Sequence, residues 1–276
     1  MADIYGSHFE YGGVSSRRYG LYFVAAGTTR NTMVSGSISS VTVFNKAEKR
    51  RYLSATSYDE SPLTYDVEIV TDYDGPIPQN ERREIEKWLF NREDYKKLYL
   101  DKADDTSGDT VELINGETKR LYMNARFINA ERMEYNGGVA GYRATIEADS
   151  GWWWQDEVSE AFTFDGGAGS GETITLTADT DIDDYIYPKV TIVTGDSGGE
   201  ITIVNTTDDE DRETKFVELT PSSTITMRGG VNYVSGTSYQ KMYKMNFPRL
   251  MDGENTIRVT GDIASMTIAW NNRRNL

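Results

Sequence analysis

Few residues of this chain could carry out acid–base or nucleophilic chemistry. Among its 276 residues there is no cysteine, and His8 is the only histidine. A serine nucleophile needs a base beside it, and zinc sites are built mainly from histidine and cysteine ligands. The composition therefore excludes disulfides, thiolate zinc sites and cysteine nucleophiles, and it leaves no frame for a Ser-His triad. We predict a protein that is not an enzyme and needs no cofactor.

Two glycine-rich segments resemble known site motifs only superficially. Gly166-Gly-Ala-Gly-Ser-Gly171 lacks the Gly-Lys-Ser/Thr ending of a phosphate loop, and no helical pattern follows it. Gly195-Asp-Ser-Gly-Gly199 resembles a serine-protease loop, but nothing in the sequence frames a triad around it. We interpret the first as a hairpin loop or hinge and the second as a turn between strands.

Carboxylates are abundant, with 44 Asp and Glu against 29 Lys and Arg and a formal net charge of −15. Two acidic runs, Asp179–Asp184 and Asp208–Asp211, could offer oxygen ligands to Ca²⁺, but neither has the EF-hand spacing. We expect both to be solvated turns. Paired carboxylates for glycoside hydrolysis could be drawn from so many acids that their presence alone has no diagnostic weight.

Three consecutive tryptophans are the strongest aromatic candidate for binding. Trp152, Trp153 and Trp154 form either an aromatic seam that packs two domains together or a platform on which sugars stack. Domain packing is the favoured interpretation, because buried aromatic residues dominate interfaces.

Small basic clusters stand out in this acidic chain and are candidates for contacts with an acidic neighbouring subunit, although surface solubility explains them equally well. These clusters are Arg17 and Arg18, and Lys49, Arg50 and Arg51. The net negative charge argues against a general phosphate-binding surface, so we expect no sequence-specific nucleic-acid binding. No apolar run approaches the roughly 18 residues of a membrane helix, so we expect no membrane insertion.

The elements that would position these residues are mostly strands. Eighteen Tyr, nine Phe, five Trp and 25 Gly suit pleated sheets joined by tight turns. Thr64–Val70 alternates cleanly, with Tyr65, Val67 and Ile69 on one face. Asn115-Gly116 and Asn136-Gly137 are typical of hairpin turns, because both residue types tolerate positive φ.

One helix is predicted, beginning at Asn80, which can cap its first turn. Ile85, Trp88 and Leu89 follow the i, i+3, i+4 spacing of a buried stripe. We expect these three side chains to belong to the core of the N-terminal domain.

The sequence pattern changes at the Trp152–Trp154 run. Beyond it, seven short strand candidates are separated by Gly, Asn, Asp and Ser, a pattern typical of a sandwich or jelly roll. We predict a mainly β protein with two domains. Residues 1–151 would form an antiparallel β-sandwich or barrel with one α-helix, and residues 152–276 a β-sandwich.

The order of these features resembles the distal tail proteins of long-tailed siphophages. In the N-terminal half the resemblance rests on Ile4-Tyr-Gly6, Gly20-Leu-Tyr-Phe23 and Pro62–Ile69. Its most recognisable part is Glu84-Ile-Glu-Lys-Trp-Leu89 followed by Leu98-Tyr-Leu-Asp101. Near the other end, Phe247–Gly261 and Met266-Thr-Ile-Ala-Trp270 are similar to the closing strands of the same family. The middle, roughly 157–244, matches by strand pattern only, and the Gly-Arg-Asp-Gly-like turn of many relatives is replaced by Asn45–Tyr52.

The resemblance implies a structural role. Distal tail proteins form a hexameric ring at the end of the tail tube, and their C-terminal domains are galectin-like β-sandwiches. The ring joins the tube to the tail hub and often holds receptor-binding proteins or side fibres. We therefore expect a virion protein of the phage tail tip, made in the host cytoplasm, whose partners are copies of itself, the tail tube protein, the tail hub, and receptor-binding proteins or side fibres. An acidic lumen would repel DNA. The alternative is a carbohydrate-binding module that recognises host-surface glycans through its C-terminal sandwich.

Overall fold

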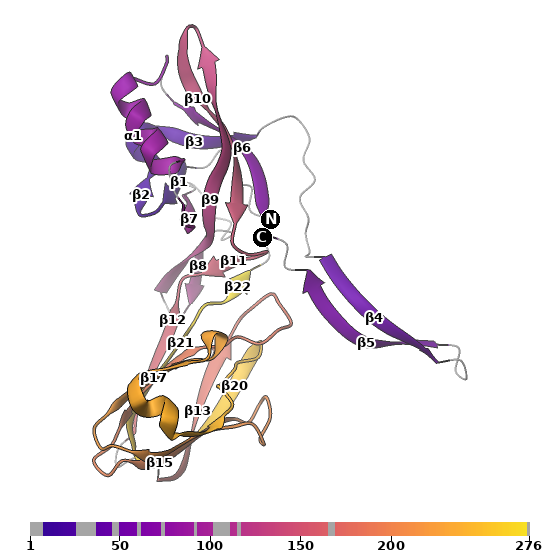
Figure 1. The fold of residues 1–276 in the computed structure, drawn as a ribbon, viewed down its shortest axis with the longest axis vertical. Coiled ribbons are helices and arrows are strands. Elements are labelled where there is room, and N and C mark those ends of the chain that lie inside the picture. The colour runs from indigo at the N-terminus through magenta and orange to yellow at the C-terminus, as the bar shows by residue number, and fades with distance from the viewer. Residues whose placement is uncertain are drawn as a thin grey trace. The chain divides into compact units, whose positions relative to one another are not determined.

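The computed structural model describes residues 8–25, 37–45, 50–59, 62–72, 75–90, 93–101, 111–114, 117–164 and 169–274 (Figure 1). These residues fall into two compact units, one ending at Trp154 and the other formed by Gln155–Arg274. Within the described ranges the elements are antiparallel strands, one α-helix and three short 3-10 helices. The prediction of a mainly β protein with one α-helix is confirmed.

The N-terminal unit is built around one antiparallel sheet in the order β2-β1-β7-β9-β10-β6-β3. Its strands are β1 (His8–Tyr11), β2 (Val14–Ser15), β3 (Leu21–Ala25), β6 (Thr64–Thr71), β7 (Lys96–Asp101), β9 (Glu117–Tyr135) and β10 (Gly138–Ala148). The short strands β8 (Val111–Ile114) and β11 (Trp153–Gln155) also pair with β9. The 3-10 helix η1 (Ser16–Tyr19) connects β2 to β3.

Two further strands of this unit, β4 (Ser37–Asn45) and β5 (Arg50–Asp59), form a two-stranded sheet of their own. They pair antiparallel along their whole length, from Ser37 opposite Asp59 to Asn45 opposite Arg50. Among the described strands they pair only with each other.

The single α-helix, α1, spans Gln79–Leu89 and begins one residue before the predicted start. Asn80 therefore lies inside the first turn and does not cap it. Pro78 takes the capping position, and its carbonyl accepts the first helical hydrogen bond from Arg82 N at 2.9 Å. Proline is tolerated here because the N-cap residue lies outside the helix and its nitrogen takes part in no intrahelical hydrogen bond.

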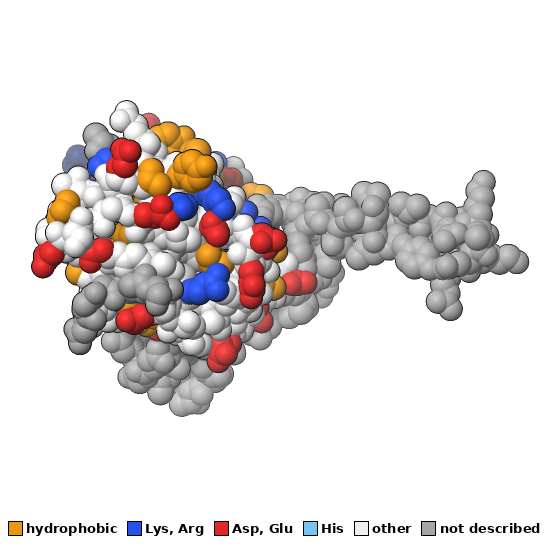
Figure 2. All heavy atoms as spheres, turned by 90° about the horizontal axis from the view of Figure 1, so that it is seen from below, with side chains coloured by type: hydrophobic (Ala, Val, Ile, Leu, Met, Phe, Trp, Pro, Cys, Tyr) orange, Lys and Arg blue, Asp and Glu red, His pale blue; other side chains and the backbone are white. Residues whose placement is uncertain are grey.

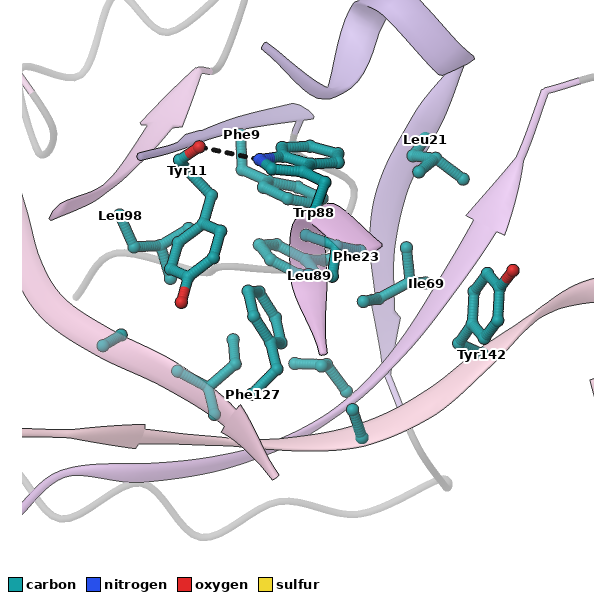
Figure 3. Packing of buried hydrophobic residues seen from close by; sticks show 14 of the residues in the cluster. Phe9, Tyr11, Leu21, Phe23, Ile69, Trp88, Leu89, Leu98, Phe127 and Tyr142 are labelled. Carbon is teal, nitrogen blue, oxygen red and sulfur yellow. Dashed lines mark hydrogen bonds between the residues drawn. The ribbon is translucent and has the colours of Figure 1, made fainter. Parts of the chain in front are cut away.

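Helix α1 buries one stripe against one face of the sheet (Figure 3). Ile85 and Leu89 are fully buried and Trp88 is 7% exposed. Across from them Phe9 and Phe23 stack with ring centroids 4.1 Å apart. The i, i+3, i+4 spacing thus places these three helix residues in the core of the N-terminal unit.

The β9–β10 hairpin turns at Asn136 and Gly137, whose φ values are 51° and 78°. Two successive left-handed residues are what an Asn-Gly hairpin turn requires. The Asn115-Gly116 turn lies outside the described residues.

The C-terminal unit consists of two five-stranded antiparallel sheets. One has the order β12-β21-β14-β17-β18, formed by β12 (Val158–Thr163), β21 (Ile263–Trp270), β14 (Lys189–Thr194), β17 (Thr224–Arg228) and β18 (Tyr233–Val234). The other has the order β13-β20-β15-β16-β19, formed by β13 (Gly169–Ala178), β20 (Gly253–Gly261), β15 (Gly199–Asn205), β16 (Glu213–Leu219) and β19 (Met242–Met245). The 3-10 helices η2 (Gly229–Val231) and η3 (Gly236–Lys241) and the short strand β22 (Arg273–Arg274) complete the unit.

Alternate residues of both sheets are buried, as in a sandwich whose two inner faces form the core. Ile192 and Met266 come from the first sheet, and Phe216 and Val259 from the second; all four are completely buried.

Candidate functional site

Trp88 joins helix α1 to the first strands of the sheet (Figure 3). Its indole N–H donates to the backbone carbonyl of Tyr11 at 2.9 Å, and its ring stacks on Phe9 with centroids 5.8 Å apart. With Val14, Arg18, Tyr19, Glu84 and Lys87, it lines a shallow cavity of about 310 Å³. The cavity has an aromatic floor and a rim of mixed charge.

The basic cluster Arg17 and Arg18 lies in η1, beside this cavity. Arg18 lies 3.8 Å from the Glu84 carboxylate and 5.2 Å from the Tyr19 ring centroid. It therefore makes an ion pair and a cation–π contact within the N-terminal unit. The Tyr19 hydroxyl donates to Glu84 at 3.1 Å, and burial together with this hydrogen bond raises the pKa of Tyr19. A contact of these arginines with a neighbouring subunit stays a prediction.

The second basic cluster lies at the start of β5. Lys49 is outside the described residues, and for Arg50 and Arg51 the structure describes the backbone alone. Their backbones pair with Asn45 and Phe44 of β4. A role for these side chains in subunit contacts also stays a prediction.

The three tryptophans have different surroundings. Trp153 belongs to the core of the N-terminal unit, is 1% exposed, and its indole nitrogen lies 3.4 Å from the Tyr65 hydroxyl. Trp152 is 6% exposed, which leaves neither of these two rings with a face open to a sugar. Trp154 is half-buried and donates to the Ser150 hydroxyl at 3.0 Å. Packing of the run between domains stays a prediction.

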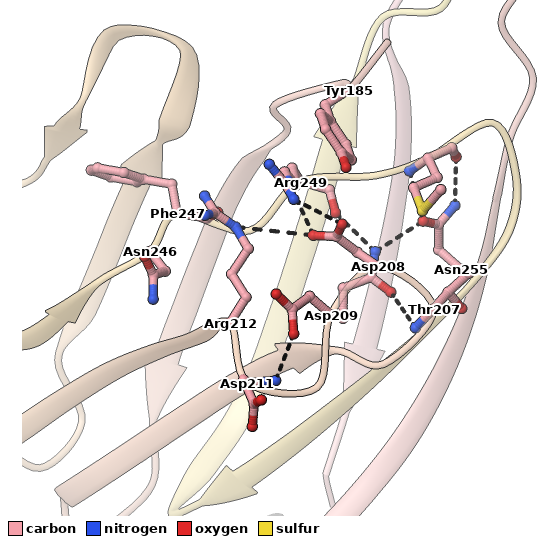
Figure 4. A network of polar contacts seen from close by, with 12 residues as sticks. Tyr185, Thr207, Asp208, Asp209, Asp211, Arg212, Asn246, Phe247, Arg249 and Asn255 are labelled. Atoms are coloured by element: carbon pink, nitrogen blue, oxygen red, sulfur yellow. Dashed lines mark hydrogen bonds and ion pairs between the residues drawn. The ribbon is translucent and has the colours of Figure 1, made fainter. Parts of the chain in front are cut away.

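The acidic run Asp208–Asp211 was expected to be a solvated turn, and for Asp208 this is wrong (Figure 4). Its side chain is 3% exposed and accepts two hydrogen bonds from Arg249, at 2.7 and 2.9 Å. The Arg249 guanidinium also lies over the Tyr185 ring, 3.5 Å from its centroid. The carboxylate is buried because a planar guanidinium satisfies both of its oxygens.

The run Asp179–Asp184 is likewise paired with arginines. Arg274 contacts Asp179 at 2.8 Å and Asp181 at 3.2 Å, and Arg273 contacts Asp184 at 3.1 Å. Both arginines come from β22, more than eighty residues further along the chain. These acids hold the end of the C-terminal unit to the loop before β14.

The Gly195–Gly199 segment is a turn, as interpreted. The Asp262 carboxylate accepts hydrogen bonds from the backbone N–H groups of Ser197 and Gly198, at 2.5 and 2.8 Å. Of the Gly166–Gly171 segment, residues 166–168 lie outside the described residues and the rest begins β13.

Cross-strand ion pairs cover the outer face of the N-terminal sheet, and sequence reasoning missed them. Arg120 pairs with Glu10 at 2.9 Å, Arg126 with Glu147 at 2.7 Å, and Arg143 with Glu68 at 2.6 Å. The pKa of Glu147 is lowered by hydrogen bonds from the Tyr95 hydroxyl and from Arg126. In each of these three pairs, the charge of the arginine is balanced by its glutamate partner.

No cluster of catalytic type emerges in the described part of the chain. His8, the single histidine, lies with its Nδ1 2.8 Å from the backbone carbonyl of Leu21. Nowhere among the described residues do three His, Asp or Glu side chains gather as a metal site would require. The described helices include none that is long and apolar enough to cross a membrane.

Each of the two units is built mainly from antiparallel strands. The chain belongs to a phage tail protein family: residues 4–150 match a phage tail protein N-terminal domain, and residues 152–270 match a phage tail C-terminal domain. It is a structural component of a phage tail.

Solved structures of phage tail proteins share this fold. The crystal structure of the SPP1 Dit (gp 19.1) protein, described as a paradigm of the hub adsorption apparatus in phages that infect Gram-positive bacteria, matches with a TM-score of 0.62. At 12% identity, the match covers 97% of this chain and 99% of that one. A chain of the phage P2 baseplate in its activated conformation with Ca matches with a TM-score of 0.51 and 8% identity, over 98% of this chain and 99% of that one. No curated protein sequence matches this chain. The resemblance to distal tail proteins is confirmed.

Proposed function

We propose that this chain forms a hexameric ring at the tip of a phage tail, where it joins the tail tube to the tail hub and holds receptor-binding proteins or side fibres. The family and the fold support a role in the tail. The β4–β5 hairpin is the observation that carries the step from a tail protein to an oligomer.

The hairpin needs a partner surface. Its strands have nine and ten residues and, among the described strands, pair only with each other. An isolated two-stranded hairpin is at best marginally stable in water, because it has too little apolar surface to bury. Docking onto a neighbouring copy would supply that surface and would link the copies into a closed assembly.

Charge favours another copy of this chain as the neighbour. Arg50 and Arg51 begin β5 and follow Lys49 in the sequence, whereas the chain as a whole has a formal net charge of −15. Opposite potentials across an interface steer association and fix its register. A basic hairpin end would therefore dock on an acidic body.

The mass of the purified full-length chain tests the ring. Light scattering should give six copies, and negative-stain images should show rings. Replacement of residues 37–59 by a short Gly-Ser linker should give a monomer whose N-terminal unit remains folded. A wild-type chain that stays monomeric at high concentration would refute the ring.

Charge reversal tests the basic end of the hairpin. Arg50→Glu with Arg51→Glu should weaken the assembly, because it places like charges at the contact. The matched control is Arg228→Glu with Arg258→Glu, which makes the same change of charge at two exposed positions of the C-terminal unit. If both double variants weakened the assembly equally, the net charge of the chain would explain the effect, and a contact made by the hairpin would not.

A further inference from the structure

The outer face of the sheet β12-β21-β14-β17-β18 is covered by small and hydroxyl-bearing side chains. The strand register aligns them in three rows that cross the sheet. The rows are Ser159, Ala269, Lys189, Arg228 and Tyr233; Ala161, Thr267, Thr191 and Thr226; and Thr163, Ser265, Val193 and Thr224. None of these residues is acidic.

This face is open to solvent, whereas the alternate residues of the same strands are buried. In β14, Val190 and Ile192 are in the core, while Lys189, Thr191 and Val193 are partly exposed. Ala269 is the one member of the three rows that is buried. The rows therefore form a continuous outward surface of one sheet.

The absence of acids from this face is unusual for this molecule. The chain has 44 acidic residues, and Figure 2 shows acidic side chains scattered over the surface of the molecule seen from below. In the opposite sheet, acids are paired with lysines: Glu200 with Lys215, and Glu213 with Lys244. Solubility would be served equally well by acids on both sheets, so the acid-free face calls for another reason.

Two positive charges stand directly opposite each other on this face. Lys189 of β14 faces Arg228 of β17 in the register. Like charges at directly opposed cross-strand positions are destabilising, with Cβ atoms about 5 Å apart. Neither side chain forms an ion pair with any residue whose side chain is described. An anion bound between them would relieve the repulsion.

An aromatic ring and a row of hydroxyls adjoin this pair. Tyr233 lies opposite Arg228 in the same row and is 48% exposed. In the next row the hydroxyl oxygens of Thr191 and Thr226 are 3.3 Å apart. Proteins can recognise a sugar that carries a negative group with three features: an aromatic ring for stacking, hydroxyls for hydrogen bonds and a pair of cations. All three are present on this face.

We propose that this sheet face binds an anionic polysaccharide. A sugar ring stacks on Tyr233, its carboxylate or phosphate lies between Lys189 and Arg228, and its hydroxyls bond to Thr191 and Thr226. This function is additional to ring assembly and does not depend on it, although six copies in a ring would raise the apparent affinity.

A protein partner fits this face less well. Protein interfaces are depleted in Ser, Ala and Lys, and large aromatic or apolar residues at their centre supply most of the binding energy. Here the centre of the face is Thr191, Thr226 and Thr267, and the one large aromatic residue, Tyr233, is at the edge of the sheet. A row of exposed hydroxyls suits a long polar polymer better.

Binding is tested on the full-length chain by affinity electrophoresis in gels that contain a polymer. Polygalacturonate offers carboxylates and phosphomannan offers phosphates, so the two gels separate the sources of negative charge. Dextran is the neutral sugar control, and polyglutamate is the polyanion without sugar. We expect retardation by at least one anionic polysaccharide with a Kd below about 1 mM, and none by dextran or polyglutamate.

Variants locate the site. Lys189→Gln with Arg228→Gln should weaken binding at least about tenfold, because hydrogen bonds to charged groups are lost. Tyr233→Ala should weaken binding as well, without any change of charge. Lys215→Gln with Arg258→Gln removes the same charge from the opposite sheet and should leave binding unchanged; circular dichroism checks that every variant is folded.

Several results would overturn the proposal. These are no binding to either anionic polysaccharide, equal binding to polyglutamate, or equal loss of binding in the variant of the opposite sheet. Light scattering on the same variants tests whether the face is instead a contact between proteins. If Lys189→Gln with Arg228→Gln changes the number of copies in the assembly, the face is a protein interface. A monomeric wild-type chain that still binds the polysaccharide would refute the ring and leave this inference standing.

Discussion

A single side chain can hold several elements together, and Trp88 does so in the N-terminal unit. Its ring stacks on Phe9 of β1 and lies 5.7 Å from the Tyr19 ring of η1, centroid to centroid. Its N–H donates to the backbone carbonyl of Tyr11, a β1 residue that pairs with Val14 of β2. The side chain of Trp88 in helix α1 thus contacts both strand β1 and the 3-10 helix η1.

Trp88→Ala should lower the free energy of unfolding of the N-terminal unit by about 3–5 kcal/mol, since it removes a large buried aromatic side chain and leaves a cavity. Urea denaturation followed by circular dichroism measures the change. The control is Arg83→Ala at an exposed position of the same helix, expected within about 0.5 kcal/mol of wild type. A Trp88→Ala protein as stable as the control would show that the ring is not an anchor.

For single residues, the sequence predicts burial in the core better than it predicts which side chains form ion pairs with each other. Ile85, Trp88 and Leu89 were assigned to the core because their spacing is a local property of one helix. The partner of Asp208 could not be assigned, because Arg249 is 41 residues away and reaches it only once the strands are in register. The outer ion pairs are harder still: Arg120 and Glu10 are 110 residues apart.

At the scale of elements, a charged contact joins α1 to β9. Arg132 donates two hydrogen bonds to the Glu86 carboxylate, at 2.7 and 2.9 Å, and the Tyr142 hydroxyl lies 3.4 Å from it. With Phe90, Ala130 and Glu131, these residues line a cavity of about 280 Å³. Because β9 is exposed from Asn129 to Glu131, this contact supports the outer part of the β9–β10 hairpin.

The hydrogen bonds from Arg132 lower the pKa of Glu86 below its ordinary value of 4.5. A carboxyl with a lowered pKa in the folded state adds stability that is present above the ordinary pKa and is lost as the pH falls through the lowered one. We therefore expect the wild type to be more stable than Arg132→Gln at pH 7, with the difference vanishing on acidification below pH 4.5.

Melting temperatures of the two proteins between pH 7 and pH 2 measure this difference, and a carbon-13 NMR titration of Glu86 follows the pKa directly. Arg143→Gln is the matched control, since it removes an exposed arginine from a cross-strand pair away from the helix. A Glu86 pKa that is the same in the wild type and in Arg132→Gln would contradict the assignment.

Elements were predictable where their signals are local. The helix pattern and the Asn136-Gly137 turn depend on neighbouring residues and were found. The extent of β9, which runs over Glu117–Tyr135, was not. Asn129, with φ of 54°, breaks the pairing there, and beyond it several residues are exposed on both faces of the hairpin, so no alternation marks the strand.

For the whole molecule, two compact units with separate cores suggest two cooperative transitions. The described residues of the N-terminal unit pack around α1, and those of the C-terminal unit fill the space between two sheets. The described residues divide into these units after Trp154, next to the Trp152–Trp154 run at which the sequence pattern changes. The proposed assembly of copies could not be derived from one chain, since its contacts would lie on surfaces whose partners are other molecules.

Scanning calorimetry of the full-length chain should therefore show two unfolding transitions, each sensitive to a substitution in its own unit. Trp88→Ala should lower one transition and leave the other in place. Gly261→Ala should lower the second, because Gly261 has φ of 115° and a Cβ there would lie 2.2 Å from the Glu200 carbonyl oxygen. Strain and overlap of this kind cost a few kcal/mol, about 1–3, which is enough to shift a transition by several degrees. If both substitutions moved a single transition, the two units would unfold together, and the cores would have to be treated as one cooperative system.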